Sequence, residues 1–225
     1  MSLLSIGKEL HYDGLDIHSI TLCELENHVS LQDYEYIIIH GGDGSIRRVV
    51  KILDKKEHQV KLILNPIGSF NVIAKMHQVP KFKEVLEKIV QKEVLTIKEQ
   101  SYYRLNHEIF LFSAGNMGDV QHIFLSESLR FGWLKHGVAK YILAFLFLLP
   151  VHLIMTPFML LSKRKFFIFT PASFIKKFGS FYGRVEPIHI DLGSVFHTLE
   201  LDGDLVTIEE QILDIKAAGQ LSIVT

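Results

Sequence analysis

The apolar positions near the start of the chain predict a strand followed directly by a helix. Residues 36–39 form a β-branched apolar run that ends at a His-Gly-Gly sequence, which is typical of a buried strand entering a glycine turn. Apolar residues then recur at helical spacing, so we expect a helix that starts at Ser45. Its apolar positions are Ile46, Val49, Val50 and Leu53.

The same arrangement occurs a second time. Residues 60–64 predict a strand, residues 65–69 a loop, and residues 70–76 the start of another helix. Residues 81–91 carry apolar side chains on one face and Lys and Glu on the other, which predicts an amphipathic helix. This alternation to about residue 95 predicts an α/β domain with a parallel sheet.

From Val94 onward the pattern becomes strand-like and predicts a second, β-rich domain. We expect an α/β domain over residues 1–95, completed by residues 216–225, and a β-rich domain over residues 96–215. The predicted strands of the second domain are 102–105, 109–113, 166–170, 188–192, 196–201 and 211–215.

A long apolar stretch interrupts the β-rich part. Residues 141–161, within a predicted helical segment 136–161, contain no acidic or basic residue apart from His152. The pattern fits a buried helix pair and a segment lying on a membrane surface equally well, while two prolines and the histidine disfavour a single span. We expect peripheral membrane contact from the basic residues at its ends, Lys135, Lys140, Lys163, Arg164 and Lys165.

Composition narrows the class of protein. With 225 residues, 48% of them hydrophobic, the chain can bury the core of one large domain or two small ones. A formal net charge of −1 disfavours a nucleic-acid partner, because proteins that bind the phosphate backbone carry a large excess of Lys and Arg. The single cysteine, Cys23, cannot form an internal disulfide, which favours a cytoplasmic location or the inner face of the membrane.

The first glycine loop, Gly41, Gly42, Asp43, Gly44 and Ser45, has the chemistry of a phosphate site. Glycine tolerates positive φ and lets a ligand approach the main chain closely. The unpaired N–H groups and positive dipole of the following helix point to the same place. Ser45 would then cap the helix or bond a phosphate. The alternative is a plain tight turn with Asp43 as a cap.

The second loop also follows a strand and repeats this logic. It contains Gly68, Ser69 and Asn71, whose hydroxyl and amide groups suit a nucleotide sugar or phosphate. The sequence GGDGS, followed after a helix and a strand by NPIGSFNVIA, resembles the diacylglycerol kinase catalytic domain family, which includes bacterial lipid kinases and sphingosine kinases. Those proteins carry GGDGT and then PxGTxNDxA. The related NAD kinases share the first motif, but their GxNxGxxGF stretch is missing from this sequence.

The resemblance implies an NAD kinase/diacylglycerol kinase-like fold and transfer of the γ-phosphoryl group of ATP, with Mg²⁺, to a lipid hydroxyl. Residues 199–204 resemble the late Asp-Gly-Glu motif of the family, so the general base falls to Asp204, with Asp202 beside it. The alternative for this segment is a β-turn, since Asp-Gly is a common hairpin signal. Fainter similarity covers residues 112–119 and 217–224.

Several positions depart from the family pattern. Arg47 and Arg48 replace Asn-Glu, Val72 replaces an Asp, and residues 1–29 supply no Asn-Pro-x-Ser-Gly loop. Arg47 would clamp phosphate or lie on a solvated helix face. These changes keep a second hypothesis open, a catalytically weak protein that binds nucleotide or lipid as a regulator, and a third, a membrane-interacting scaffold. A homodimer also stays open.

Other site chemistries are disfavoured. The 12 histidines show no paired spacing such as HxxxH, which argues against a metal hydrolase. Ser69 does not lie in a GxSxG sequence, so a serine hydrolase is unsupported.

Overall fold

The computed structural model describes residues 2–27, 30–56, 60–68, 70–116, 139–161, 164–170, 181–182 and 187–225. The chain divides into two compact units: the first is Met1–Tyr102 with Gly219–Thr225, and the second is Tyr103–Ala218. Two strands, β5 (Ile97–Leu105) and β13 (Ile212–Val224), belong partly to each unit. The boundary predicted at residue 95 lies before β5, whereas the units divide within that strand.

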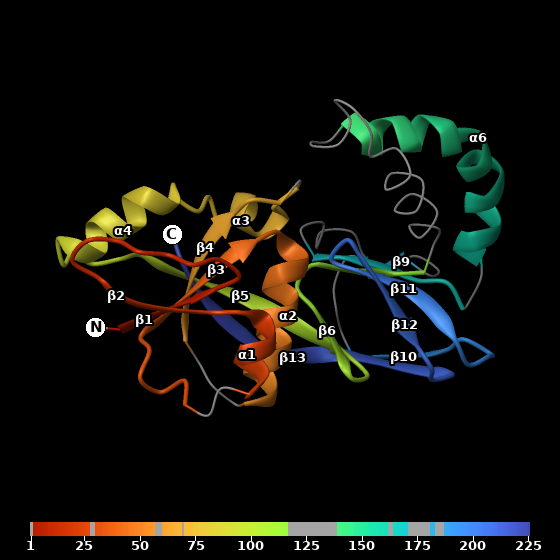
Figure 1. Ribbon diagram of the computed structural model, residues 1–225. Helices are drawn as coiled ribbons and strands as arrows, with labels where there is room; N and C mark the ends of the chain where they lie inside the picture. Colours follow the sequence, from red (N-terminus) through yellow and green to blue (C-terminus); the bar gives the residue numbers. More distant parts are fainter. Residues whose placement is uncertain are drawn as a thin grey trace. The chain divides into compact units, whose positions relative to one another are not determined.

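The first unit is a parallel sheet with helices. Its strands follow the order β2-β1-β3-β4-β13-β5, and the pairs β1–β2, β1–β3, β3–β4 and β4–β13 are parallel (Figure 1). The predicted α/β architecture is confirmed. Besides β5 and β13, its elements are β1 (Ser2–Ile6), β2 (Asp16–Ile20), α1 (Leu22–Asn27), β3 (Tyr36–Gly41), α2 (Asp43–Lys55), β4 (Lys61–Pro66), α3 (Val72–Met76) and α4 (Phe82–Val90).

The two longer helices of this unit cover opposite faces of the sheet. Ile63 of β4 packs in one core with Val85, Leu86 and Ile89 of α4. Its neighbour Leu62 lines a cavity beside α2. Because successive strand residues point to opposite faces, α2 and α4 lie on different sides. Each helix buries one apolar stripe, which is why the sequence pattern predicted both.

The first 27 residues form three elements that the sequence pattern did not predict: β1, β2 and α1. Parallel strands are usually joined through a helix, but residues 7–15 join β1 to β2 as a loop. Leu10, Tyr12 and Leu15 of this loop pack against the core on the α4 side. The loop therefore covers part of the sheet, and its irregular spacing explains why no element was predicted.

The second unit is β-rich, as predicted. Five of its strands form a sheet of their own in the order β12-β11-β7-β8-β9. Every pair in this sheet is antiparallel except β8–β9. Phe110, Phe166 and Leu199 are fully buried in its core. The elements are β6 (Glu108–Phe110), β7 (Ser113–Gly115), α6 (Ala139–Leu161), β8 (Phe167–Phe169), β9 (Phe181–Tyr182), β10 (Ile188–Asp191), β11 (His197–Leu201) and β12 (Asp204–Ile208).

The strand predicted over residues 109–113 is divided into two strands. β6 ends at Phe110 and β7 begins at Ser113. Between them, the N–H groups of Leu111 and Phe112 donate to the Asp202 carboxylate instead of to a neighbouring strand. The Asp202 side chain, 91 and 90 residues later in the sequence, therefore interrupts the strand pairing at the residues between β6 and β7.

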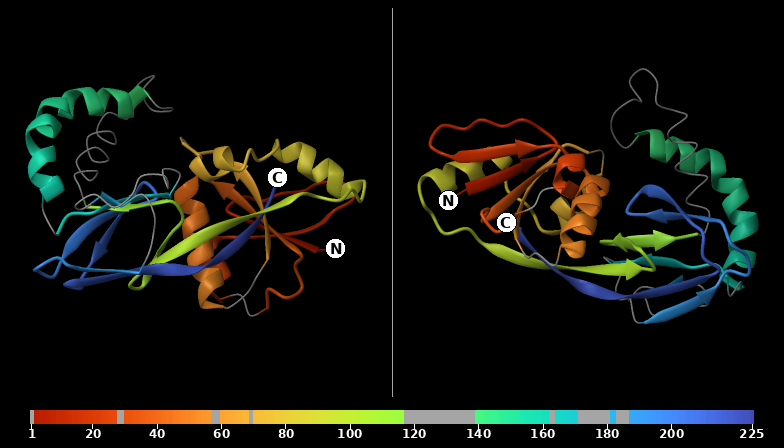
Figure 2. Two further views of the ribbon diagram at one scale, coloured as in Figure 1. Left: turned by 180° about the vertical axis from the view of Figure 1, so that it is seen from behind. Right: turned by 60° about the horizontal axis from the view of Figure 1, so that its bottom comes forward.

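The predicted apolar segment forms helix α6, which contains Pro150 and Pro157 and bends along its length (Figure 2). Its large side chains are mostly exposed where they are described, including Phe147 at 65% and Leu153 at 70%, while Ala144 is buried. In the described ranges, no helix meets the length and apolarity needed to span a membrane. Lys135 and Lys163, predicted at its ends, lie outside the described residues.

Candidate functional site

The first glycine loop connects the end of β3 to the start of α2. The sequence pattern predicted that this helix starts at Ser45, but it begins at Asp43. Gly42 is its N-cap and has an extended conformation. The N–H groups of Ser45 and Ile46 both bond to the Gly42 carbonyl. The loop therefore leads straight into the positive end of a 13-residue helix, where N–H groups of the first turn favour an anion.

Glycine is needed in this loop for space, not for a positive φ. Gly41, Gly42 and Gly44 all lack positive φ, so the expected left-handed turn is absent from this described loop. A Cβ added to Gly41 would lie 2.3 Å from Ser45 Oγ. Ser45 thus lies against the strand end that carries the loop.

The second glycine loop packs directly against the first. A Cβ on Gly68 would lie 2.6 Å from the Cα of Gly42 and 2.8 Å from Asn71 Oδ1. Asn71 has the left-handed φ of 49°, accepts from the Gly68 N–H at 3.0 Å and donates to the Gly68 carbonyl at 2.7 Å. Asn71 therefore shapes this loop through its own side chain. Ser69 lies outside the described residues.

Asp43 joins the two loops. Its carboxylate accepts from the N–H groups of Val72 at 2.8 Å and Ile73 at 3.0 Å, so it caps α3 and not its own helix. Burial raises the pKa of the Asp43 carboxyl, and the hydrogen bonds from Ile73 and Val72 oppose that rise. The carboxylate, buried at 7% exposure, is a fixed part of the loop pair.

The two arginines of α2 differ in burial. Arg47 is 5% exposed, whereas Arg48 is exposed. A solvated helix face therefore describes Arg48 and does not describe Arg47. The beginning of the second turn of α2 therefore carries one buried guanidinium, close in sequence to the first glycine loop.

A hydrogen-bonded chain lies at the ends of β1, β3 and β4, directly before the glycines. Asn65 Nδ2 donates to His40 Nδ1 at 2.8 Å, and the Ser5 hydroxyl donates to the Lys8 carbonyl at 2.8 Å. His40 Nε2 lies 3.1 Å from Ser5 Oγ and therefore donates to it. The ring is thus held neutral.

Burial lowers the pKa of His40, and the nearby charge of Lys8 lowers it further. Sequence reasoning missed this group, although His40 and Asn65 end adjacent strands and stand in register. The shared position of two polar residues at two strand ends was the available signal. The chain of bonds fixes the backbone from which Gly41 and Gly42 project.

The predicted catalytic pair lies in the second unit. Asp202 and Gly203 form the turn of the β11–β12 hairpin, with φ of 52° and 85°. The Asp202 carboxylate is 5% exposed and accepts from the N–H groups of Leu111, Phe112 and Ser113 at 2.7 to 3.0 Å. Asp204, the first residue of β12, is half-buried. Asp202 therefore organises the backbone of the strands that meet at this hairpin.

Metal ligands do not gather in the part of the chain that the structure describes: it contains no group of three or more His, Cys, Asp or Glu able to hold a metal ion. Asp43, the acidic residue of the glycine loops, is engaged with backbone N–H groups.

Comparison with known proteins shows which family this part of the chain is similar to. Residues 16–101 match the model of the diacylglycerol kinase catalytic domain. The resemblance to that family is confirmed. The matched stretch contains both glycine loops of the kinase-like domain and lies within the first unit.

Individual relatives are distant. The curated protein named "Putative lipid kinase" of Streptococcus pneumoniae serotype 4 is 23% identical over 112 residues, covering 48% of this chain and 37% of that protein. A diacylglycerol kinase structure from Bacillus anthracis is 21% identical, covers 56% of this chain and 52% of that one, and has a TM-score of 0.41. An NAD kinase from Archaeoglobus fulgidus, solved in complex with ATP, is 14% identical over 51% of this chain and 47% of that one, with a TM-score of 0.34. The chain thus spans about half or less of the length of these relatives.

Proposed function

We propose that this chain is an ATP-dependent lipid kinase, or a major part of one, which transfers the γ-phosphoryl group to a diacylglycerol-like hydroxyl. The observation that carries the proposal is the pair of glycine loops joined by Asp43, within the stretch that matches the diacylglycerol kinase catalytic domain. Two loops with glycine at their contact expose main chain at the start of a helix, which is the geometry that binds phosphate.

The roles of the residues follow from this geometry. Gly41, Gly42, Gly44 and Ser45 would present the start of α2 to the phosphates. Gly68, Ser69 and Asn71 would form the facing wall, and Arg47 would add positive charge. Bound ATP with Mg²⁺ supplies the phosphoryl group and part of the charge neutralisation. Asp204 would accept the proton of the lipid hydroxyl, with Asp202 holding the turn on which it stands.

Helix α6 supports access to a lipid surface. Its exposed side chains Phe145, Leu146 and Phe147 are consecutive and so spread over about 200° of the helix circumference, which is wider than a single stripe. An exposed arginine, Arg164, follows the helix. We propose that α6 lies in the membrane interface while the kinase acts on a lipid there.

Radiolabelled phosphate transfer tests the activity. The chain is incubated with MgATP and a panel of dispersed lipids that includes diacylglycerol and sphingosine. We expect a labelled lipid from the wild type and a loss of at least about 100-fold in Asp204→Asn, because general-base catalysis contributes roughly 10²–10⁴-fold. The neighbouring carboxylate of Glu209, exposed and in the same unit, provides the matched control Glu209→Gln.

A regulatory function is the second candidate. It is favoured by Arg48 and Val72, which stand where the resemblance places two carboxylates of the family. A thermal shift with MgATP together with no labelled product from any lipid would support this candidate against the kinase. Absence of both signals would contradict both and favour a scaffold.

Vesicle flotation tests the membrane contact separately. We expect the wild type to float with anionic vesicles and Phe147→Glu to float less, because a charge in the interface opposes insertion. Equal flotation of the variant, or wild-type protein that stays in the lower fraction, would contradict the role of α6.

A further inference from the structure

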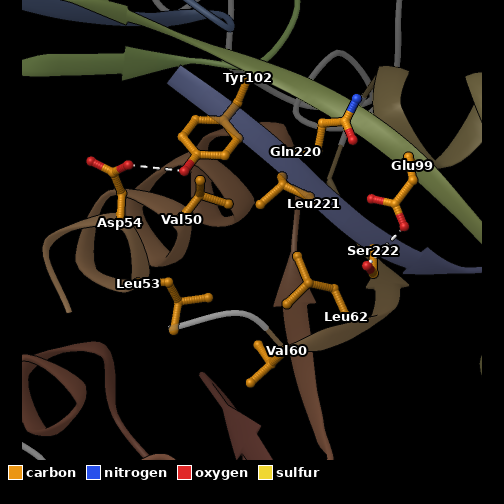
Figure 3. Close-up of a pocket in the computed structure, with 10 residues that line it drawn as sticks. All are labelled: Val50, Leu53, Asp54, Val60, Leu62, Glu99, Tyr102, Gln220, Leu221 and Ser222. Atoms are coloured by element: carbon orange, nitrogen blue, oxygen red, sulfur yellow. Dashed lines mark hydrogen bonds between the residues drawn. The ribbon is translucent and has the colours of Figure 1, made fainter. Parts of the chain in front are cut away.

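The two units differ in where they keep apolar surface outside their cores. The first unit contains a cavity of about 490 Å³ on the α2 side of its sheet. Within it, the hydroxyl of Tyr102 donates to Asp54 and that of Ser222 donates to Glu99 (Figure 3). These polar side chains bond one another, so the cavity by itself identifies no ligand. The second unit instead carries apolar side chains that are exposed.

Exposed apolar side chains occur at two places in the second unit, on helix α6 and in the turn of residues 192–196 that joins β10 to β11. On α6 they include Leu153 and Ile154. In the turn, Val195 is 53% exposed and Phe196 is 68% exposed. Large apolar side chains that gather on a surface mark an interaction site.

Hydrogen bonds hold the turn in one conformation. Asp191 Oδ1 accepts from the Gly193 N–H at 2.7 Å, and His197 Nε2 donates to the Ser194 carbonyl. Between these bonds Phe196 has a φ of 70°, which lies in the left-handed region and is an outlier for a bulky side chain. Backbone strain of this kind persists where the surrounding structure maintains it, and it clusters at functional segments. The turn therefore presents an aromatic ring to solvent from a fixed and strained backbone.

Arg164 joins the turn to the end of α6. It is exposed and lies three residues after the last residue of that helix. A Cβ on Gly193 would lie 2.4 Å from Arg164 Cζ, so the guanidinium lies against the glycine of the turn. In Figures 1 and 2 the C-terminal end of α6 and the turn lie at the same end of the second unit. The two apolar segments are therefore parts of one surface.

The charges of this surface favour an anionic partner. Its described residues, 164–165 and 191–197, include the cations Arg164 and Lys165 and one carboxylate, Asp191. The carboxylate already accepts from the Gln211 side chain at 3.0 Å and from the turn. Apolar side chains beside an excess of positive charge are typical of proteins that lie on anionic membranes.

The distribution of the apolar side chains favours a membrane over a protein groove. A helix that binds a protein groove uses a single apolar stripe, whereas the exposed side chains of α6 spread more widely than one stripe. The turn adds a second apolar projection beside the end of the helix. A lipid interface can accept both, because it deforms around each of them.

We propose that Val195 and Phe196 insert into the interface of an anionic bilayer beside α6, with Arg164 at the level of the headgroups. The inference rests on the proposed contact of α6 with a lipid surface and adds a second point of contact. Two points of contact fix the orientation of the second unit on the membrane, which one helix alone does not.

Sedimentation of the full chain with vesicles of phosphatidylglycerol and phosphatidylcholine tests the proposal. Phe196→Asn removes the ring but suits the left-handed φ, so the variant keeps the fold, and a melting curve verifies this. We expect it to bind about tenfold more weakly, because the buried apolar area of the ring is lost. The matched control is Val94→Asn at a 97% exposed apolar position of the first unit, which should bind like the wild type.

The contribution of Arg164 is tested with the same vesicles. Arg164→Gln should weaken binding about fivefold, whereas Arg164→Lys, which keeps the charge, should bind like the wild type. On vesicles of phosphatidylcholine alone, Arg164→Gln and the wild type should bind equally. Equal binding of Arg164→Gln and the wild type to the anionic vesicles would overturn the headgroup contact.

A fluorescent probe reports insertion directly. Cys23, the single cysteine, is replaced by serine, and an environment-sensitive dye is attached to Val195→Cys or, as the control, to Val94→Cys. We expect a blue shift with anionic vesicles for the dye at position 195 and none for the dye at position 94. Equal shifts at both positions would contradict insertion of the turn.

Failure of this proposal can be distinguished from failure of the proposed function. If Phe147→Glu weakens vesicle binding but Phe196→Asn does not, the turn makes no contact and α6 alone binds the membrane. If Phe196→Asn instead abolishes a dimer seen by ultracentrifugation and leaves vesicle binding unchanged, the turn is a contact between two copies of the chain and the proposal is wrong. Vesicle binding through the turn without any labelled lipid product would contradict the kinase and support the proposal.

Discussion

Asp43 in the first unit and Asp202 in the second use a buried carboxylate in the same way. Each accepts N–H groups from a segment that is distant in sequence: Val72 and Ile73 for Asp43, and residues 111–113 for Asp202. Asp43 was predicted as a site residue from the first glycine loop, and Asp202 from the resemblance of residues 199–204 to the late Asp-Gly-Glu motif. Such residues can therefore be required for a site without touching a ligand.

The surroundings of the two carboxylates differ. Asp43 joins two loops that meet glycine to glycine, at Gly42 and Gly68, beside the start of a helix. Asp202 closes a hairpin and divides β6 from β7, where Ser113 also donates its hydroxyl to buried Glu200. The loops joined by Asp43 lie beside the N–H groups at the start of a helix. Asp202 instead uses the N–H groups of residues 111–113 to hold two strands and a hairpin together. We therefore expect phosphate to bind to main chain beside the Asp43 loops, whereas Asp202 serves as a framework residue.

The largest effect is expected from Asp202→Ala. It leaves three buried N–H groups without their acceptor, so we expect a loss of about 3–5 kcal/mol in the free energy of unfolding. Urea denaturation followed by circular dichroism measures the loss. Asp204→Ala, two residues later, should cost much less stability. Equal losses in the two variants would show that Asp202 is not the framework residue.

The next largest loss in the free energy of unfolding is expected from Asp43→Asn. The amide retains one acceptor but directs N–H groups at one of the two donors, so we expect a loss of about 2 kcal/mol. The thermal shift with MgATP should disappear in the same variant. Asp33→Asn, an exposed carboxylate of the same unit, is the control and should keep both properties. If Asp43→Asn kept the full free energy of unfolding, the hydrogen bonds of Asp43 would not be what holds the two loops together.

Much of this framework could be predicted from the sequence, and the exceptions have physical causes. β3, α2 and α4 were predicted because a buried run or a single apolar stripe is a local property. The partners of Asp43 and Asp202 depend on contacts between residues 29 to 91 positions apart, which no local pattern contains. The glycine loops were located correctly, but their need for space instead of positive φ depends on a second loop packed against the first.

Two glycines distinguish crowding from backbone strain. Gly68→Ala should cost about 1–3 kcal/mol because its Cβ would overlap Gly42 and Asn71. Gly203→Ala meets nothing within 4 Å, so its cost of roughly 1 kcal/mol comes from φ alone. Asn tolerates positive φ, so Gly203→Asn should recover stability in urea denaturation, whereas Gly68→Asn should not. Recovery at both positions would contradict the contact between the loops.

The smallest effect concerns pH. Burial holds the pKa of His40 below its ordinary value of 6.5, so the unfolded chain takes up this proton at a higher pH than the folded chain. The His40 contribution is therefore complete above the unfolded pKa and is lost as the pH falls through it. Urea midpoints at about pH 7.5 and about pH 5.5 should diverge more for the wild type than for His40→Gln. Identical divergence would exclude His40 as a source of the pH dependence.

The hydrogen bonds from Val72 and Ile73 to Asp43 also make the opening of the loop pair measurable by amide hydrogen exchange. The amide protons of Val72 and Ile73 are held by a carboxylate on another helix, so they exchange with solvent only when the two loops separate or the unit unfolds. Their exchange rates, read by NMR in deuterium oxide, report how often the loop pair opens in the absence of any ligand.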